Sequence, residues 1–438
     1  MDRLPPEIQG EILHLACDVS DEKERCSYAT VSRTWQAFVE RANFSTLYLN
    51  QARLEEAQAE GIITPVRQSC IRCIKFDALL PDEHCRVNIE TVSKGSSEAI
   101  SESVAKLLEA LKTWSSPPCG IELILNLRYE GERGPDPGRG RAFRLALFTS
   151  FVSLPQNAYC QMPEVPSVTK FTHGRDWPDK LCLAPKASCE IASRFPNLQA
   201  IDWNFVQGYK VVYGDNDVRE ERRKDFATGI SILPESIRDV YISGDYFEDA
   251  FVNTPCQKGT PDPLGLALRG LMKQLEHLTL TIPIGSELFN DPDLSQECEE
   301  PLWPRLHEIS IATGGRTPQG HDLFDLQSFV PLMGNRTEAQ YRVGHPFKQG
   351  EVWCLALAHA AAHMPKLRLI NIWWANTTGT SLEYRVEPDS SGATFQIKSS
   401  PGLSISTEIQ NEWWKAARVH IREGGVYISW LRMRDCDT

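Results

Sequence analysis

Residues 365–374 read PKLRLINIWW, and this stretch decides the fold class of the body. Pro365 disfavours helix in the residue before it, so it ends the apolar helical pattern of residues 351–364. From Leu367 onward the apolar residues follow the order Leu-x-x-Ile-x-Ile, and the last two are spaced as in a β-strand with one buried face. The stretch therefore predicts a helix followed directly by a strand.

The same apolar phrase recurs along the chain. Its copies begin at Leu198, Leu275, Leu306 and Leu367, with related copies at Ile71, Ile237 and Val168. Helical patterns lie between them, over residues 99–114, 187–195, 264–275 and 351–364. A strand–helix–strand order with parallel crossovers is the simplest arrangement of such a chain. The sequence therefore predicts an α/β fold with a mostly parallel sheet.

The recurring phrase makes residues 51–438 similar to a leucine-rich-repeat solenoid, in which strands line a concave face and helices cover the convex one. Two features depart from that family. No asparagine or cysteine recurs after each strand, and the spacing is about doubled between Leu306 and Leu367. The resemblance implies an irregular solenoid, and the alternating residues 381–397 and 426–431 are expected to be strands that close the end of its sheet.

A candidate binding surface follows from the period of two in each strand. The residue between the last two apolar positions of a phrase must point away from the core. These outward residues are Asp202, Tyr241, Thr279, Ser310 and Asn371, and the next outward set is Asn204, Ser243, Thr281, Ala312 and Trp373. Polar, mostly uncharged groups around the aromatic Tyr241 and Trp373 suit a protein substrate, and they lack the arginine cluster of a phosphopeptide reader. The alternative is an inert solvent face.

A short helical module is predicted before residue 51. Pro5 and Pro6 suit the first turn of a helix, and Ile8, Ile12 and Leu15 then recur at helical spacing. Two further short helices are expected over residues 22–32 and 34–41. A unit of fewer than about 50 residues buries too little apolar surface to be robust alone. The module is therefore either a docking unit for a partner or a helical cap on the body.

The residues of this module resemble an F-box, in the form found in filamentous fungi. The resemblance rests on residues 4–8 (LPPEI), on residues 12–13 and on residues 28–38 (YATVSRTWQAF). It implies a three-helix F-box over residues 1–50 that binds the Skp adaptor and, through it, the cullin scaffold of a ubiquitin ligase. The positions that carry this role over are Leu4, Pro5, Ile8, Ile12, Leu13, Val31 and Trp35.

The body also resembles the uncharacterised region that follows the F-box in many of these fungal proteins, in residues 364–367, 372–374, 382–385 and 413–414. The two resemblances together imply a substrate receptor, with residues 51–438 recognising an unknown protein. No enzymatic activity comes with either resemblance. The alternative is a scaffold or structural solenoid that never meets a cullin, and an unrecognised hydrolase is the third possibility.

Composition narrows the classes of partner. A net charge of -12 gives no general attraction to nucleic acid. The longest apolar stretches, residues 145–154 and 355–364, are too short to span a bilayer, so no membrane segment is expected. The N-terminus lacks a signal-peptide pattern, and thirteen cysteines without framework spacing favour reduced thiols. These features predict an intracellular protein, in the cytoplasm or the nucleus.

Motifs for catalysis and metal binding are incomplete. His359 and His363 have the spacing of two ligands on one helix face, but Ala360 stands where a zinc protease has its glutamate. Cys70 and Cys73 form a CxxC with no second pair to complete a site. Neither a nucleophile elbow nor a phosphate-binding glycine loop is present. The sequence therefore predicts no catalytic residues, no metal and no cofactor.

Overall fold

The chain forms two compact units. The first comprises residues 1–134, 154–176 and 194–198, and the second comprises residues 135–153, 177–193 and 199–438. The computed structural model describes residues 5, 8, 10–12, 15–16, 27–80, 89–114, 119–129, 151–174, 182–205, 216–244, 261–290, 301–313, 317–318, 323, 348–374, 381–389, 391–399, 406–421 and 425–432.

The first unit contains four parallel strands and several helices. Its elements are α3 (Arg33–Phe44), β1 (Thr46–Asn50), α4 (Gln51–Ala59), α5 (Pro65–Gln68), β2 (Cys73–Leu80), α6 (Ile89–Lys112), β3 (Ile121–Tyr129), the 3-10 helix η2 (Ala158–Gln161) and β5 (Val168–His173). The strands lie in the order β1-β2-β3-β5, and all three pairings are parallel. Residues 8, 10–12, 15–16 and 27–28 are also helical.

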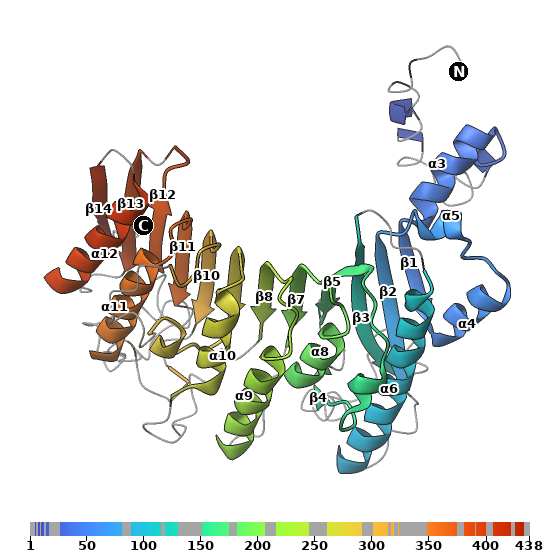
Figure 1. The fold of residues 1–438 in the computed structure, drawn as a ribbon, viewed down its shortest axis with the longest axis horizontal. Helices are drawn as coiled ribbons and strands as arrows, with labels where there is room; N and C mark the ends of the chain where they lie inside the picture. Colours follow the sequence, from blue (N-terminus) through green and yellow to red (C-terminus); the bar gives the residue numbers. More distant parts are fainter. Residues whose placement is uncertain are drawn as a thin grey trace, which may run out of the picture. The chain divides into compact units, whose positions relative to one another are not determined.

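The second unit continues the alternation of strand and helix (Figure 1). Its elements are β4 (Phe151–Val152), β6 (Cys182–Leu183), α8 (Pro185–Ala192), β7 (Ala200–Asn204), α9 (Asn216–Ile230), β8 (Asp239–Ser243), α10 (Pro263–Met272), β9 (His277–Thr281), η4 (Ser286–Leu288), β10 (Glu308–Thr313), α11 (Lys348–Ala362), β11 (Leu369–Trp374), β12 (Ser381–Val386), β13 (Gly392–Ser399), α12 (Thr407–His420) and β14 (Gly425–Arg432).

The strands of the second unit are parallel except at β12. Strands β7 to β11 pair in chain order, each parallel to the next. β12 runs antiparallel to β11 and β13, and β14 is again parallel to β13. Figure 1 shows α9, α10, α11 and α12 on one side of these strands. No described helix lies on the other side of β7 to β11, and we call that side the open face.

Local sequence explains where the helices begin. Asp262 accepts hydrogen bonds from the backbone N–H groups of Leu264 and Gly265, and Pro263 occupies the first turn of α10. Ser406 accepts from the N–H of Ile409 at the start of α12. Side-chain oxygens at this position satisfy N–H groups that have no partner within the helix. The helices therefore start where their capping residues stand.

Large aromatic residues fill the core between the helices and the sheet. In the second unit, Trp353 of α11 packs edge-on against Phe289 and Trp374. Trp413 of α12 stacks on Phe395 of β13 with ring centroids 4.6 Å apart. Each of these tryptophans is almost fully buried, so the covered side of the sheet holds the hydrophobic core.

The predicted α/β class and mostly parallel sheet are confirmed, and the strands expected over residues 381–397 and 426–431 are β12, β13 and β14. Four strands were not predicted: β1, β3 and the two-residue strands β4 and β6. β3 alternates buried and half-buried residues without the proline or the Leu-x-x-Ile order that marks the other strands. β1 lies within residues 1–50, yet it pairs with β2, so the sheet begins before residue 51. Within the described part of the chain, no helix has the length and apolar character to cross a membrane.

Candidate protein-interaction surfaces

The N-terminal helices carry apolar side chains that the first unit does not cover. Ile8 is helical and 42% exposed, and Val31, in the turn before α3, is 63% exposed. Leu15, which was not among the predicted adaptor-binding residues, is 64% exposed. Pro5 is exposed and Ile12 is half-buried, whereas Leu4 and Leu13 lie outside the described residues. Exposed aliphatic side chains on several short helical segments are a feature of docking sites.

Trp35 has a different position from the exposed residues. It lies in the first turn of α3, half-buried, with its ring centroid 5.5 Å from that of Tyr28. Its backbone N–H donates to the hydroxyl of Ser32, which caps the helix. The hydroxyl of Thr30 in turn donates to the carbonyl of Ser27 at 2.7 Å. Trp35 therefore supports the turn that presents Val31.

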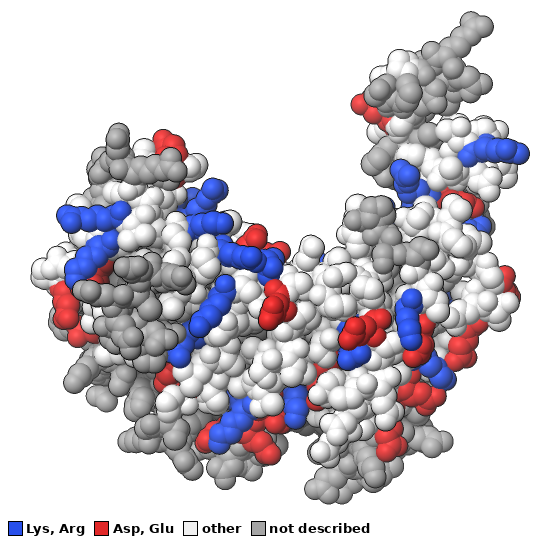
Figure 2. All heavy atoms as spheres, viewed as in Figure 1, with Lys and Arg blue, Asp and Glu red and all other residues white. Residues whose placement is uncertain are grey.

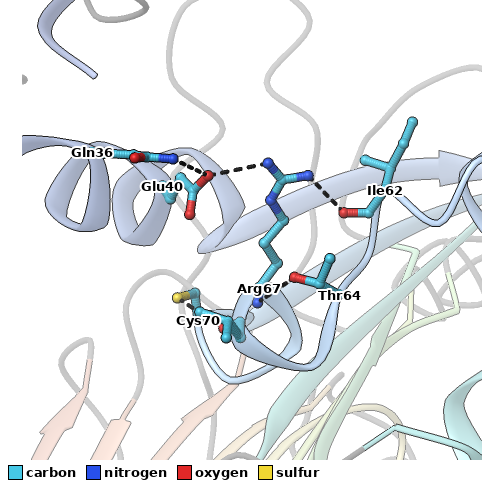
Figure 3. A network of polar contacts seen from close by, with 7 residues as sticks. Gln36, Glu40, Ile62, Thr64, Arg67 and Cys70 are labelled. Carbon is cyan, nitrogen blue, oxygen red and sulfur yellow. Dashed lines mark hydrogen bonds and ion pairs between the residues drawn. The ribbon is translucent and has the colours of Figure 1, made fainter. Parts of the chain in front are cut away.

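A polar network fixes α3 to α5 (Figure 3). The guanidinium of Arg67 donates to Oε1 of Glu40 at 3.1 Å and to the carbonyl of Ile62 at 2.8 Å. Gln36 donates to the same Glu40 oxygen. Arg67 also lies over the ring of Phe44, 4.7 Å from its centroid. These contacts hold α3 to α5, so the last predicted helix of the module is joined to the part of the first unit that follows it.

The open face of the second unit brings the predicted substrate-binding residues into one row. Strand register places Asp202, Tyr241, Thr279, Ser310 and Asn371 directly beside one another on β7 to β11, and we call them the central row. Asn204, Ser243, Thr281, Ala312 and Trp373 form the next row in the same register. The register therefore brings these residues together in two neighbouring rows, and their role in substrate binding stays a prediction.

Exposure differs along the rows. Tyr241 is 41% exposed and Trp373 is 48% exposed, while Thr279 and Ser310 are half-buried. Asp202, expected to point outward into solvent, is only 8% exposed. The alternation of side chains along a strand predicted on which side of β7 Asp202 lies. It does not predict which other parts of the protein cover that side chain. Asp202 is therefore the one predicted residue of the central row that offers little surface to a partner.

The two aromatic residues flank a floor of small side chains. Tyr241 is on β8 and Trp373 is on β11, and the strands between them carry Thr279, Thr281, Ser310 and Ala312. Strands about 4.8 Å apart put β8 and β11 about 14 Å apart. A surface with aromatic residues at two sides and small polar groups between them can accept a protein segment by apolar contact and hydrogen bonding.

A third row, at the amino-terminal ends of the parallel strands, was not predicted. Nδ1 of His277 lies 2.5 Å from Oδ1 of Asp239, and the His277 ring lies 6.0 Å from that of His307. On β12, Arg385 forms an ion pair with Glu383 at 2.8 Å. The same period of two, extended back from the central row, would have identified Asp239 and His277. Acidic and basic side chains are interspersed in the view of Figure 2.

The strands β2, β3 and β5 of the first unit carry charged side chains that pair with one another. Lys170 contacts Glu122 at 2.9 Å, and Arg128 contacts Asp77 at 3.2 Å. Lys75 lies over the ring of Tyr48, 5.0 Å from its centroid. Because these charges already pair with one another, they suit partner binding less well than the central row does.

Two of the four candidate metal ligands of the sequence, His359 and Cys70, contact other groups. Nε2 of His359 lies 3.3 Å from Oε2 of Glu412 on α12. Burial lowers the pKa of His363, and the charge of the neighbouring His359 lowers it further. Burial raises the pKa of the Cys73 thiol, and the thiol of Cys70 donates to the carbonyl of Val66. In the ranges that the structure describes, no group of three or more His, Cys, Asp or Glu side chains could hold a metal ion.

A buried hydrogen-bond chain joins α12, β12 and the end of α11. Nε2 of His420 lies 3.0 Å from the carbonyl oxygen of Met364, and Nδ1 lies 2.6 Å from the hydroxyl of Tyr384. Since a carbonyl only accepts, Nε2 carries the proton and Nδ1 accepts from the Tyr384 hydroxyl. Burial lowers the pKa of His420 and raises that of Tyr384. His420 is therefore neutral and holds α12 in place.

The part of the chain that contains this hydrogen-bond chain is the part that matches a known family. A model described as a family of unknown function (DUF6546) matches residues 348–435, which run from α11 to β14. The match covers less than half of the chain. No curated protein matches the chain.

Proposed function

We propose that this protein is a substrate receptor of a Skp-cullin-F-box ubiquitin ligase and has no catalytic residues of its own. The N-terminal helices would bind the Skp adaptor, and the open face of the second unit would bind a protein substrate. The observation that carries the proposal is the exposure of Ile8 and Leu15 on helical segments and of Val31 in the turn before α3, within a stretch that has the F-box residue pattern.

Energetics favour a partner at these three residues. Covering a Leu, Ile or Val side chain contributes about 1.5–3 kcal/mol when it moves from full exposure to full burial. The three side chains retain 42% to 64% of their exposure, so a substantial part of that free energy is available to an interface. The proposed adaptor surface comprises Pro5, Ile8, Ile12 and Val31, with Leu4 and Leu13 as further members from the sequence and Trp35 as support.

We also propose that the body, residues 51–438, is an irregular leucine-rich-repeat-like solenoid. Support comes from five consecutive parallel strands with the same phrase, whose equivalent residues fall into shared rows. The antiparallel β12 departs from a regular repeat, as do the unequal intervals. A sheet side over which the described residues place no helix suits partner binding, because parallel sheets normally have both faces covered.

Substrate binding would centre on the two aromatic residues of the open face. Tyr241 and Trp373 have the amphipathic rings that dominate the binding energy of protein interfaces. Uncharged Thr279, Ser310 and Asn371 between and beside them supply hydrogen-bonding groups. We propose that the substrate segment is recognised without a phosphate group, because neither row contains arginine or lysine.

Co-expression of the full chain with a Skp adaptor and a cullin tests the proposal. The adaptor and the cullin should co-purify with the wild-type chain, and both should be lost from the Ile8→Ala/Val31→Ala variant. Val66→Ala is the matched control, because Val66 is 69% exposed but lies on α5, outside the proposed surface. Recovery of the adaptor without the cullin would favour the scaffold function, and recovery of neither would refute the receptor.

A further inference from the structure

The open face continues past β11 onto β12 and β13. In strand register, Trp373 lies beside Ser381 of β12, and Ser381 lies beside Lys398 of β13. Side chains alternate along these strands, and Leu382 and Ile397 are buried on the covered side. Ser381 and Lys398 are half-buried on the other side. The row that reaches β11 at Trp373 therefore extends, on the same side of the strands, to Lys398.

Lys398 has no ion-pair partner among the residues that the structure describes. The acidic residue next to it on β12 is Glu383, which lies opposite Gln396 and so diagonally from Lys398. Glu383 is already engaged, because Nε and Nη2 of Arg385 contact its Oε1 at 2.9 Å and 2.8 Å. The described strands around Lys398 therefore do not neutralise its positive charge.

An unpaired basic residue on a strand is an exception in this chain. The other strand lysines and arginines whose side chains the structure describes each have a contact: Lys75 with the ring of Tyr48, Arg128 with Asp77, Lys170 with Glu122 and Arg385 with Glu383. A charge that is paired within the protein has little left to offer a partner. Lys398 differs from these residues, because its amine is available to form an ion pair with another molecule.

The spacing between the exposed aromatic ring and this amine suits an extended peptide. With strands about 4.8 Å apart, the Cα atoms of Trp373 and Lys398 are about 10 Å apart. Each residue of an extended chain advances about 3.3 Å, so about three residues span the distance. Ser381, between them, has a small side chain and forms a low floor. A segment that crosses the strands along this row can therefore contact both residues.

We propose that the substrate segment is acidic: it packs an apolar side chain on Trp373 and, about three residues away, binds the amine of Lys398 through an aspartate or glutamate. The inference rests on the proposed substrate-binding role of the open face and adds the chemical class of the segment. A carboxylate fits better than a phosphate, because phosphate readers typically use the bidentate fork of arginine, and Arg385 is committed to Glu383.

Selection from a display library of short random peptides on the purified full-length chain tests the inference. The wild type should enrich peptides with an apolar residue and, about three positions away, Asp or Glu. Trp373→Ala should lose the apolar preference. Lys398→Gln should lose the acidic preference alone, and Lys398→Glu should replace it with a preference for Lys or Arg. Lys415→Glu makes the same change of charge on α12, where Lys415 is 69% exposed, and should select like the wild type.

Fluorescence polarisation with one selected peptide gives the magnitude. Replacement of its acidic residue by the amide should weaken binding to the wild type about tenfold, as for a hydrogen bond to a charged group, and should leave binding to Lys398→Gln nearly unchanged. Circular dichroism confirms that the variants are folded.

Three results would overturn the proposal: enriched peptides without an acidic preference, an acidic preference that Lys398→Gln retains, or no enriched peptide at all. The selection uses the chain without the adaptor. Failure of this inference is therefore distinguishable from failure of adaptor binding, which co-purification of the adaptor reports separately.

Discussion

Asp262→Ala should lower the free energy of unfolding of the second unit more than the substitution of any exposed side chain does. Asp262 accepts from Nε of Arg223 at 2.9 Å and from Nη2 at 2.5 Å, and it caps α10 through the N–H groups of Leu264 and Gly265. The Arg223 and Asp262 side chains are 8% and 1% exposed. The variant therefore loses a helix cap and leaves a buried guanidinium without its carboxylate.

The two losses can be given magnitudes. A lost cap costs about 1 kcal/mol. Removal of one partner of a buried ion pair costs about 3–5 kcal/mol, because the other charge stays buried. The sum, about 4–6 kcal/mol, is a large fraction of the 5–15 kcal/mol that stabilises a typical domain. Arg223 also donates to the carbonyl of Pro283, and a neutral carbonyl does not replace a carboxylate.

Urea unfolding followed by near-UV circular dichroism measures the effect. The midpoint of the second unit should fall by roughly 1 M or more, given slopes of about 1–3 kcal/mol/M. Arg223→Met/Asp262→Ser removes both charges and retains a capping hydroxyl, so it should recover most of the loss. A cost below about 1 kcal/mol for Asp262→Ala, or a double variant no more stable than the single one, would refute the reasoning.

Three further predictions concern other parts of the chain. Burial lowers the pKa of His173 to about 3, so below pH 6.5 the unfolded chain binds a proton that the native chain excludes. The free energy of unfolding should therefore fall on the order of 2 kcal/mol between pH 7 and 5. His173→Gln should flatten that pH dependence in urea titrations. Tyr384→Phe leaves Nδ1 of His420 without its donor and should lower stability by about 1–3 kcal/mol, measured by the same unfolding assay, whereas an unchanged midpoint would contradict the assigned tautomer. Gly120→Ala should destabilise the first unit in thermal melts, because Gly120 has a φ of +69° and a Cβ there would lie 2.2 Å from Oγ1 of Thr169; a melt equal to wild type would contradict this.

The sequence predicted what depends on local periodicity. Tyr241 and Trp373 fall on one face because the period of two follows from strand geometry alone. A proline precedes three of the strands, at Pro196, Pro304 and Pro365, and so indicates where the preceding helix ends and the extended segment begins. The same reasoning could not find Arg223 with Asp262 or Tyr384 with His420. These partners are 39 and 36 residues apart, and only the packed fold brings them together.

The candidate sites show the same limit. Ile8 and Val31 could be selected by pattern, but the half-buried position of Trp35 against Tyr28 depends on how the two helical segments meet. Asp202 occupies its predicted register position and is nevertheless buried. β1 was missed because its five residues follow directly on α3, with no turn signal between helix and strand.

The affinity of the purified full-length chain for a purified Skp adaptor, measured by isothermal titration calorimetry, tests the proposed function most directly. The account predicts a one-to-one complex that Ile8→Ala/Val31→Ala weakens by roughly a thousandfold, since two interface anchors cost about 2 kcal/mol each. Val66→Ala should bind like the wild type. No heat of binding for the wild type, or an unchanged affinity for a double variant that circular dichroism shows to be folded, would contradict the account.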